Sequence, residues 1–526
     1  MKSSNYLFIL LALGGVFSCA QLKEDPKSFI SSTQFYKTEA DALEAVNACY
    51  YWLNNGDAST PGGATAQTPY NVLFSTGMEM MTDDINPGPG ATNPDVRSQA
   101  VLQHNSAGLR VLQIWQFSYA AIRTANIAIA KIPQIPFPGK DTTLRNRYVA
   151  EAKVNRALWY FNLVRLYGDV PLILEDQDVY DNSAIQVART PAAQVYAQIE
   201  ADLIAASKVL PSSYGAADVG RATSGAAKAI LSKVYLTEQK YTQSDSLASA
   251  IITSGQYSLI PNYAHVFLPA YKNGTEHIFS AQFKSNSQGQ GNGNAPRGAR
   301  TGVPGLTASY ADQLVYYTHN GDPFFSVYKL YQKGDLRRVS ASAANSWGGA
   351  FATKFLGTDG KLYSTLNAPG DTVPYLNKYW DPSVGAQLSE SSANVPIIRY
   401  AEVLLIAAEA DNEANGGPSA NAYNYINQVR TRAGIPNLTP GLNQVQFRDS
   451  VYLERRLELV WEWQRWFDLI REKGDPNSGF IDANGGLLLP SLQLVGKNSV
   501  ALKHYLYPIP LQEINLNPKL TQNPGW

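Results

Sequence analysis

The sequence predicts a mainly α-helical protein, a tetratricopeptide-like helical scaffold that carries an irregular, loop-rich lobe with short strands. Three observations support this fold class. Apolar residues recur three and four positions apart through most of residues 38–254 and again through 397–473, which is the spacing of one helix face. From about 255 to 395, glycine, asparagine, serine, tyrosine and tryptophan replace alanine and leucine. Alanines such as Ala226 and Ala229 stand where helices would face one another, so helix axes can approach closely, although no strict 34-residue repeat is visible.

The first 19 residues have the organisation of an export signal. Met1 and Lys2 supply positive charge, an apolar run follows, and small residues precede Cys19. Because the run is too short to span a bilayer, we expect residues 1–18 to be removed and Cys19 to be lipidated. Ordinary secretion is the alternative. Cys49 then has no partner for an intramolecular disulfide, and we expect it to be a small buried side chain.

The remaining chain is expected to form one body behind a short tether. Residues 19–32 are polar and contain proline without any periodicity, so they form the tether. No linker divides residues 33–526. The expected parts of this body are a helical scaffold at 33–254 and 396–526, and an irregular ligand-binding lobe at 255–395.

The N-terminal scaffold is predicted to consist of six main helices with clear end signals. Gly168, followed by Asp169, Val170 and Pro171, ends one helix, and Thr190 is expected to cap the next before Pro191. The predicted ranges are 38–54, 107–131, 142–167, 190–209, 222–238 and 242–254.

In the lobe, a strand is expected at residues 277–283, and glycine recurs through 286–305. Long irregular segments in a compact body are more often functional than not, so this lobe is the leading ligand region. The alternative is an insertion that makes no ligand contacts.

Helical patterning returns at residues 397–415 and 419–433, and 445–473 is predicted to be the longest helix. Glu454, Glu458 and Glu462 recur at four-residue spacing, and Glu462, Arg465, Asp468 and Arg471 are each three apart, as in an ion-pair ladder along one helix. The expected buried stripe consists of Leu453, Leu457, Val460, Phe467 and Ile470.

Composition favours a neutral ligand. The 43 basic residues balance the 43 acidic ones, which gives no electrostatic footprint for nucleic acid. Only 16% of residues are charged, whereas tyrosine numbers 31 and tryptophan 9. Aromatic rings cover the C–H faces of sugars while amides and arginines bond their hydroxyls, so a glycan is the ligand that suits such a surface.

The candidate ligand residues are aromatic or polar side chains in irregular segments. They are Tyr316, Tyr317, Trp347, Arg297, Arg300, Asp83, Asp84 and Asn86. A glycoside hydrolase is a rival interpretation, with Asp83 and Asp84 or Glu175 and Asp176 as its carboxylates, but adjacent residues seldom span a scissile bond. Neither a nucleophile elbow nor a zinc or phosphate-binding motif occurs, and the five histidines show no ligand spacing, so no enzyme activity, metal site or cofactor is predicted.

Several motifs resemble the SusD/RagB family of Bacteroidetes lipoproteins, and together they extend over nearly the whole mature chain. Two departures are visible: Glu462, Trp463 and Gln464 replace the usual Glu-Gly before the arginine, and the final aromatic is Trp526. The matching segments are LYGDVPL at 166–172, GRAT at 220–223, IRYAEVLLIAAEA at 398–410, INQVRTRAG at 426–434, ERRLEL at 454–459, RWFDLIR at 465–471, YPIP at 507–510 and QNPGW at 522–526.

This resemblance implies a lipid-anchored protein at the cell surface, in the outer membrane, that binds nutrient oligomers, usually glycans, and acts with a SusC-like TonB-dependent transporter. Glu24 and Asp25 are similar to the signals that send such lipoproteins to the outer face. The matching motifs belong to the scaffold, and the resemblance transfers no ligand residue to this chain. A peptide ligand, or a scaffold that binds only the transporter, stays open.

Overall fold

The structure is a computed structural model. It describes residues 35–54, 69–87, 93–138, 142–176, 181–284, 314–316, 327–338, 350–352, 354–356, 362–364, 375–376, 378–379 and 392–526. The predictions for Cys19, Arg297, Arg300, Tyr317 and Trp347 lie outside these residues.

Most of the described chain is α-helical, as predicted. The longer helices of the N-terminal scaffold are α2 (Glu39–Asn54), α5 (Leu109–Lys131), α6 (Thr142–Tyr167), α8 (Ala192–Val209), α9 (Ser224–Thr237) and α10 (Tyr241–Thr253). After the lobe come α13 (Tyr400–Asn415), α14 (Ala420–Arg432), α15 (Gln444–Glu458) and α16 (Arg465–Arg471). Short helices are α3 (Phe74–Gly77), α4 (Pro94–Ala100), α7 (Asn182–Ile185), α12 (Val327–Leu330), α17 (Leu488–Leu494) and α18 (Leu511–Leu516).

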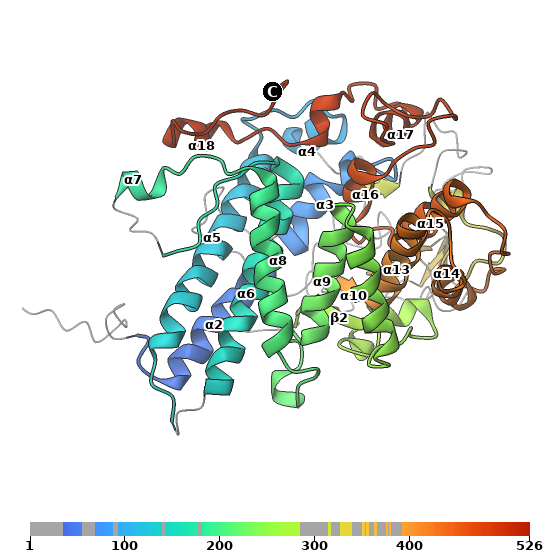
Figure 1. The fold of residues 1–526 in the computed structure, drawn as a ribbon. Helices are drawn as coiled ribbons and strands as arrows, with labels where there is room; N and C mark the ends of the chain where they lie inside the picture. The colour runs from blue at the N-terminus through green and yellow to red at the C-terminus, as the bar shows by residue number, and fades with distance from the viewer. Residues whose placement is uncertain are drawn as a thin grey trace, which may run out of the picture.

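The long helices pack in chain order, each against the next. Contacts run from α2 and α5 to α6, then through α8, α9 and α10 to α13, which also contacts α14 and α15. Figure 1 shows this row crossing the molecule from α5 to α14, with α18, α4 and α17 spread along one side of it. The arrangement confirms a scaffold of paired helices.

The predicted helix ends are confirmed in most cases by local chemistry. Gly168 has φ +71°, the left-handed conformation that favours glycine after a helix. The prediction that Thr190 caps α8 is wrong, because Thr190 forms a backbone bridge with Val170. Asp169 accepts the hydrogen bond from the Ala192 N–H instead, so a residue that follows α6, 23 positions earlier in the chain, performs the capping.

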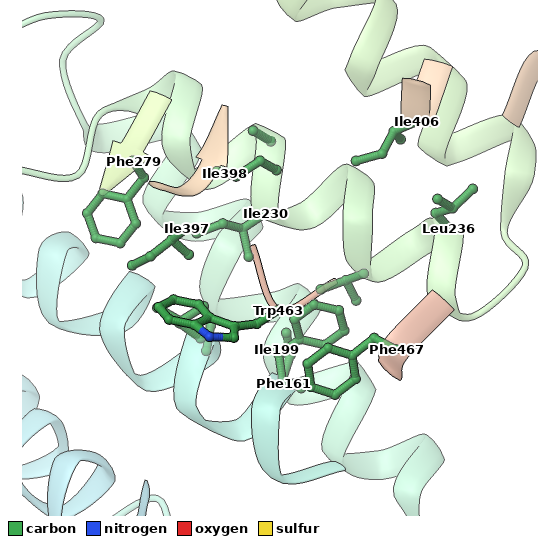
Figure 2. Close-up of a cluster of buried hydrophobic side chains, with 14 of the residues drawn as sticks. Phe161, Ile199, Ile230, Leu236, Phe279, Ile397, Ile398, Ile406, Trp463 and Phe467 are labelled. Carbon is green, nitrogen blue, oxygen red and sulfur yellow. The ribbon is translucent and has the colours of Figure 1, made fainter. Parts of the chain in front are cut away.

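The main core lies where the helices meet a two-stranded sheet. Strand β2 (His277–Ala281) confirms the predicted strand, and it pairs antiparallel with β8 (Val395–Arg399). Figure 2 shows Ile397 and Ile398 of β8 beside Ile230 of α9, with Trp463 packed beneath them. The predicted helix at 397–415 therefore begins three residues late, at Tyr400, because its first apolar residues pair with β2.

The lobe contains short antiparallel strand pairs and a second core. The pairs are β1 (Ile85–Pro87) with β3 (Leu314–Tyr316), β4 (Phe351–Ala352) with β7 (Tyr375–Leu376), and β5 (Lys354–Leu356) with β6 (Leu362–Ser364). Buried residues of the lobe, including Phe267, Tyr331 and Tyr379, pack against Val460 and Trp461 of the scaffold. The lobe therefore packs against the scaffold just after the C-terminal end of α15.

The prediction of one long helix at 445–473 is wrong. Helix α15 ends at Glu458 and α16 begins at Arg465, while Trp461 and Trp463 adopt positive φ values of 62° and 58°. The carbonyls freed at the break accept bonds from distant donors: Tyr331 Oη reaches the Leu457 oxygen at 2.7 Å, and Lys378 Nζ reaches the Val460 oxygen at 2.7 Å. These tertiary hydrogen bonds replace the helical ones.

The break also changes the predicted stripe. Leu453 is 40% exposed and Ile470 is half-buried, whereas Leu457, Val460 and Phe467 are buried as expected. Cys49 is buried as well, and burial raises the pKa of its thiol to about 12. No helix among the described residues is both long and apolar enough to cross a membrane.

Candidate functional site

The structure joins two irregular segments that lie more than 200 residues apart in the sequence. In the β1–β3 pair, Asn86 is opposite Val315 and Ile85 is opposite Tyr316. Neighbouring strands lie about 5 Å apart, so the predicted ligand residues Asn86 and Tyr316 occupy adjacent register positions of one small sheet. We take this sheet as the centre of the candidate ligand site.

Asp83 and Asp84, which precede β1, are only 2% exposed and are engaged by arginines. Arg465 Nε lies 2.8 Å from Asp83 Oδ1, and Arg456 Nη2 lies 2.6 Å from Asp84 Oδ1. Burial alone would raise the pKa of Asp83, but Arg456 and Arg465 outweigh it and hold that pKa well below its ordinary value. The two aspartates therefore hold the start of β1 in place. Because arginines already engage them, we no longer consider Asp83 and Asp84 as ligand-contacting residues.

Lys497 completes this base. Its Nζ donates to the carbonyl oxygens of Met80 at 2.6 Å and Ile85 at 3.3 Å. Burial lowers the pKa of Lys497 to about 7, against the opposing effect of Asp83 and Asp84. The chain entering β1 is thus fixed through both its side chains and its backbone.

A second set of buried charges fastens the lobe to the scaffold. Arg337 of the lobe contacts Glu454 at 2.6 Å and Glu458 at 3.0 Å, and Lys378 contacts Glu462 at 2.5 Å. The acidic members are Glu276, Asp335, Glu454, Glu458 and Glu462, and the basic members are Arg337, Lys378, Arg399, Arg430 and Arg432. We call these ten residues the anchor network; its formal charges balance.

Arg399 connects the halves of the anchor network. Its Nη1 lies 2.7 Å from Glu276 Oε1 and 2.6 Å from Glu458 Oε1, and its Nη2 donates to Glu462 Oε1 at 2.8 Å. Burial would raise the pKa of Glu458, but Arg432, Arg399 and Arg337 hold it far below its ordinary value. Each charged side chain in the network therefore has a partner of opposite sign.

The glutamates of the anchor network lie in a different environment from the one that the sequence predicted. Glu454, Glu458 and Glu462 were expected in an ion-pair ladder along one helix, whereas each is at most 3% exposed and pairs with arginine or lysine side chains from other segments. Of the predicted i,i+3 pairs, Asp468 with Arg471 forms at 2.7 Å, while Arg465 pairs with Asp83 and Glu472 instead. The partners Arg337 and Lys378 lie in the lobe, and no local spacing pointed to them.

The rival catalytic interpretation finds little support in the described residues. Asp83 and Asp84 are held by Arg456 and Arg465, and Asp84 has a raised pKa because of its burial. Within the described ranges, no group of three or more histidine, cysteine, aspartate or glutamate side chains is arranged to hold a metal ion.

Comparison with known proteins identifies the family to which this fold belongs. Residues 275–526 match the model of the SusD family, and residues 61–236 match the model described as starch-binding associating with outer membrane. A SusD-like protein of Formosa agariphila is 31% identical over 100% of both chains. The chain belongs to the SusD family.

Solved structures agree with this assignment. A SusD superfamily protein from Parabacteroides distasonis is 28% identical, with a TM-score of 0.73 over 93% of this chain and 99% of that one. A structure described as a laminarin-binding SusD-like protein is 26% identical, with a TM-score of 0.70 over 93% of this chain and 100% of that one. The motifs that suggested the family, with Arg399, Glu454, Glu458, Arg465 and Arg471 among them, supply buried ion pairs of the scaffold.

Proposed function

We propose that this protein binds neutral glycans at the cell surface and passes them, uncleaved, to a SusC-like TonB-dependent transporter in the outer membrane. The observation that carries the proposal is the β1–β3 pair, which joins the two irregular segments that contain Asn86 and Tyr316 on a base of buried ion pairs. Rigid support of this kind is what an aromatic and amide site for sugars needs, since a ring must be held in position to stack.

The matching family description, starch-binding associating with outer membrane, and the laminarin-binding neighbour support a glycan as the ligand. The low content of charged residues also favours a neutral polymer. Tyr316, Tyr317 and Trp347 are the aromatic candidates, and Arg297, Arg300 and Asn86 are the candidates for bonding hydroxyls. The proposed anchor is a lipid on Cys19.

Affinity electrophoresis against plant, algal, fungal and host polysaccharides tests the binding step. We expect one polymer to retard the protein without the release of reducing ends, and we expect Trp347→Ala to abolish the retardation. Released sugar would show an enzyme instead.

Two further measurements test delivery and anchoring. Affinity purification from membranes should recover a TonB-dependent transporter with the wild-type protein. Mass spectrometry should find acyl chains on Cys19, and Cys19→Ser should release the protein from the membrane. A protein that stays anchored after this substitution would contradict the proposed lipid site.

A further inference from the structure

Two grooves lie on either side of one short segment at the start of the lobe. Gln256 and Tyr257 line the first, which has a volume of 480 Å³. Ser258 and Leu259 line the second, which has a volume of 520 Å³. We call them the paired grooves. Each has the size of a small-ligand pocket, and no residue of β1 or β3 lines either of them.

The first groove is neutral and rich in hydrogen-bonding groups. Thr223, Gln256, Tyr257 and Asn273 are among its lining residues. Its arginine, Arg221, is neutralised by Glu151 at 3.0 Å and by Asp218 at 2.8 Å. A charged ligand would therefore find no free charge of opposite sign among these side chains.

Two residues that line the first groove each carry a buried polar atom that has no hydrogen-bond partner in the described part of the chain. These atoms are Ser280 Oγ and His277 Nδ1, on residues that are 2% and 8% exposed. Nε2 of His277 lies 2.9 Å from the Val266 carbonyl oxygen. A carbonyl can only accept, so the proton is on Nε2, and Nδ1 is an acceptor that receives no hydrogen bond. Unmet hydrogen-bonding groups of this kind are unfavourable unless a ligand or water engages them.

The second groove has the same chemistry. Asn424 and Gln428 of α14 line it together with Tyr400 of α13. Its arginine, Arg432, is neutralised by Glu276 and Glu458 within the anchor network. Because consecutive residues of one segment line both grooves, a ligand longer than one sugar could occupy both.

We infer that the paired grooves form a second glycan-binding surface, separate from the β1–β3 site, which takes a neutral saccharide across residues 256–259. Tyrosine rings cover sugar faces, while amides and hydroxyls bond the sugar's hydroxyl groups. The inference rests on the proposed function in taking a glycan as the ligand. A second surface of this kind raises the retention of a long polymer through multivalency.

The test compares groove variants with a matched control by affinity electrophoresis in laminarin, followed by the rest of the polysaccharide panel. Gln256 and Asn424 are exposed, so Gln256→Ala with Asn424→Ala should leave folding intact. Ser280→Ala removes an unpaired hydroxyl and should not lower the thermal midpoint. The control is Gln493→Ala, which removes an exposed amide on α17, a helix that lines neither groove.

We expect each groove variant to weaken retention at least threefold and the control to leave it unchanged. Equal retention of all variants would overturn the second surface and leave the proposed function intact. Loss of retention in Tyr316→Ala but not in the groove variants would likewise overturn the second surface and leave the proposed function intact. If no polymer binds, a crystal soaked in millimolar glucose is the deciding experiment. Sugar bound in the paired grooves would support the second surface even though the proposed function had failed. Empty grooves would overturn the second surface.

Discussion

At the scale of single residues, the described structure is dominated by charges that are buried and paired. Arg399 alone contacts Glu276, Glu458 and Glu462, and none of these side chains is more than 3% exposed. A buried ion pair is not in itself strong evidence of stability, because desolvation opposes it. These ion pairs instead fix the position of the lobe on the scaffold, because a misplaced lobe would leave several charges buried without partners.

Removing one charge from the anchor network should therefore be costly. We expect Glu458→Gln to lower the free energy of unfolding by about 3 to 5 kcal/mol, because Arg337, Arg399 and Arg432 lose their shared carboxylate. Urea denaturation followed by circular dichroism measures the change. Glu44→Gln, an exposed carboxylate on α2, is the control and should change stability by less than about 0.5 kcal/mol. Equal effects of the two substitutions would contradict the account.

The same carboxylates predict acid lability. Glu458, Glu462, Asp83 and Asp468 have pKa values below their ordinary ones, that of Asp468 being about 2, because neighbouring arginines and, for Glu462, Lys378 outweigh the effect of burial. The unfolded chain binds more protons than the folded chain as pH falls through about 4.5, so the stability that these groups contribute is present above that pH and is lost below it.

Urea titrations at pH 5.5, 4.5 and 3.5 would measure this loss. Glu472, whose pKa burial raises to about 7, contributes a slope of the opposite sign, which fades below about pH 4.5 as the unfolded chain also takes up this proton. We expect a steep fall in the urea midpoint over the last unit, and a smaller fall for Glu458→Gln. A midpoint that is flat over this range would show that the network contributes nothing.

At the scale of elements, local pattern predicted the helices well where the local sequence also ends them. The ends of α6 coincide with the predicted 142–167, and Gly168 supplies the left-handed residue after it. The break between α15 and α16 could not be predicted in this way, because the groups that stabilise it come from Tyr331 and Lys378 far away in sequence. The same holds for β8, whose apolar residues fit a helix or a strand equally well until β2 is placed beside them.

The C-terminal end of helix α13 allows a direct test of whether a left-handed glycine ends the helix. Gly416 has φ +69°, whereas Gly417 has an ordinary φ, and a Cβ at either position would meet no atom within 4 Å. Only the backbone conformation therefore differs between them. We expect Gly416→Ala to destabilise the protein by about 1 kcal/mol, as measured by urea denaturation.

The neighbouring substitution is the control. Gly417→Ala should be neutral or stabilise by up to about 1 kcal/mol, because it restricts only the unfolded chain. If both substitutions had the same effect, strain at Gly416 would not be what ends α13.

At the scale of the whole molecule, a row of helices supports a lobe through two sets of buried charges, one beneath β1 and the anchor network beneath the end of α15. Sequence reasoning identified the scaffold, the irregular lobe and the family. The sequence offered Asn86, Tyr316, Asp83 and Asp84 alike as ligand candidates, from side-chain chemistry in irregular segments, because only the fold shows which polar residues are paired with arginines.

The most direct test of the central claim is calorimetric titration of the purified protein with the polysaccharide that retards it, repeated with Tyr316→Ala and with Tyr271→Ala. Tyr271 is a surface tyrosine, 40% exposed and stacked on His265, so its loss should leave the β1–β3 region unchanged. The account predicts at least tenfold weaker binding for Tyr316→Ala and wild-type binding for Tyr271→Ala. Wild-type affinity in Tyr316→Ala would contradict a glycan site centred on the β1–β3 pair.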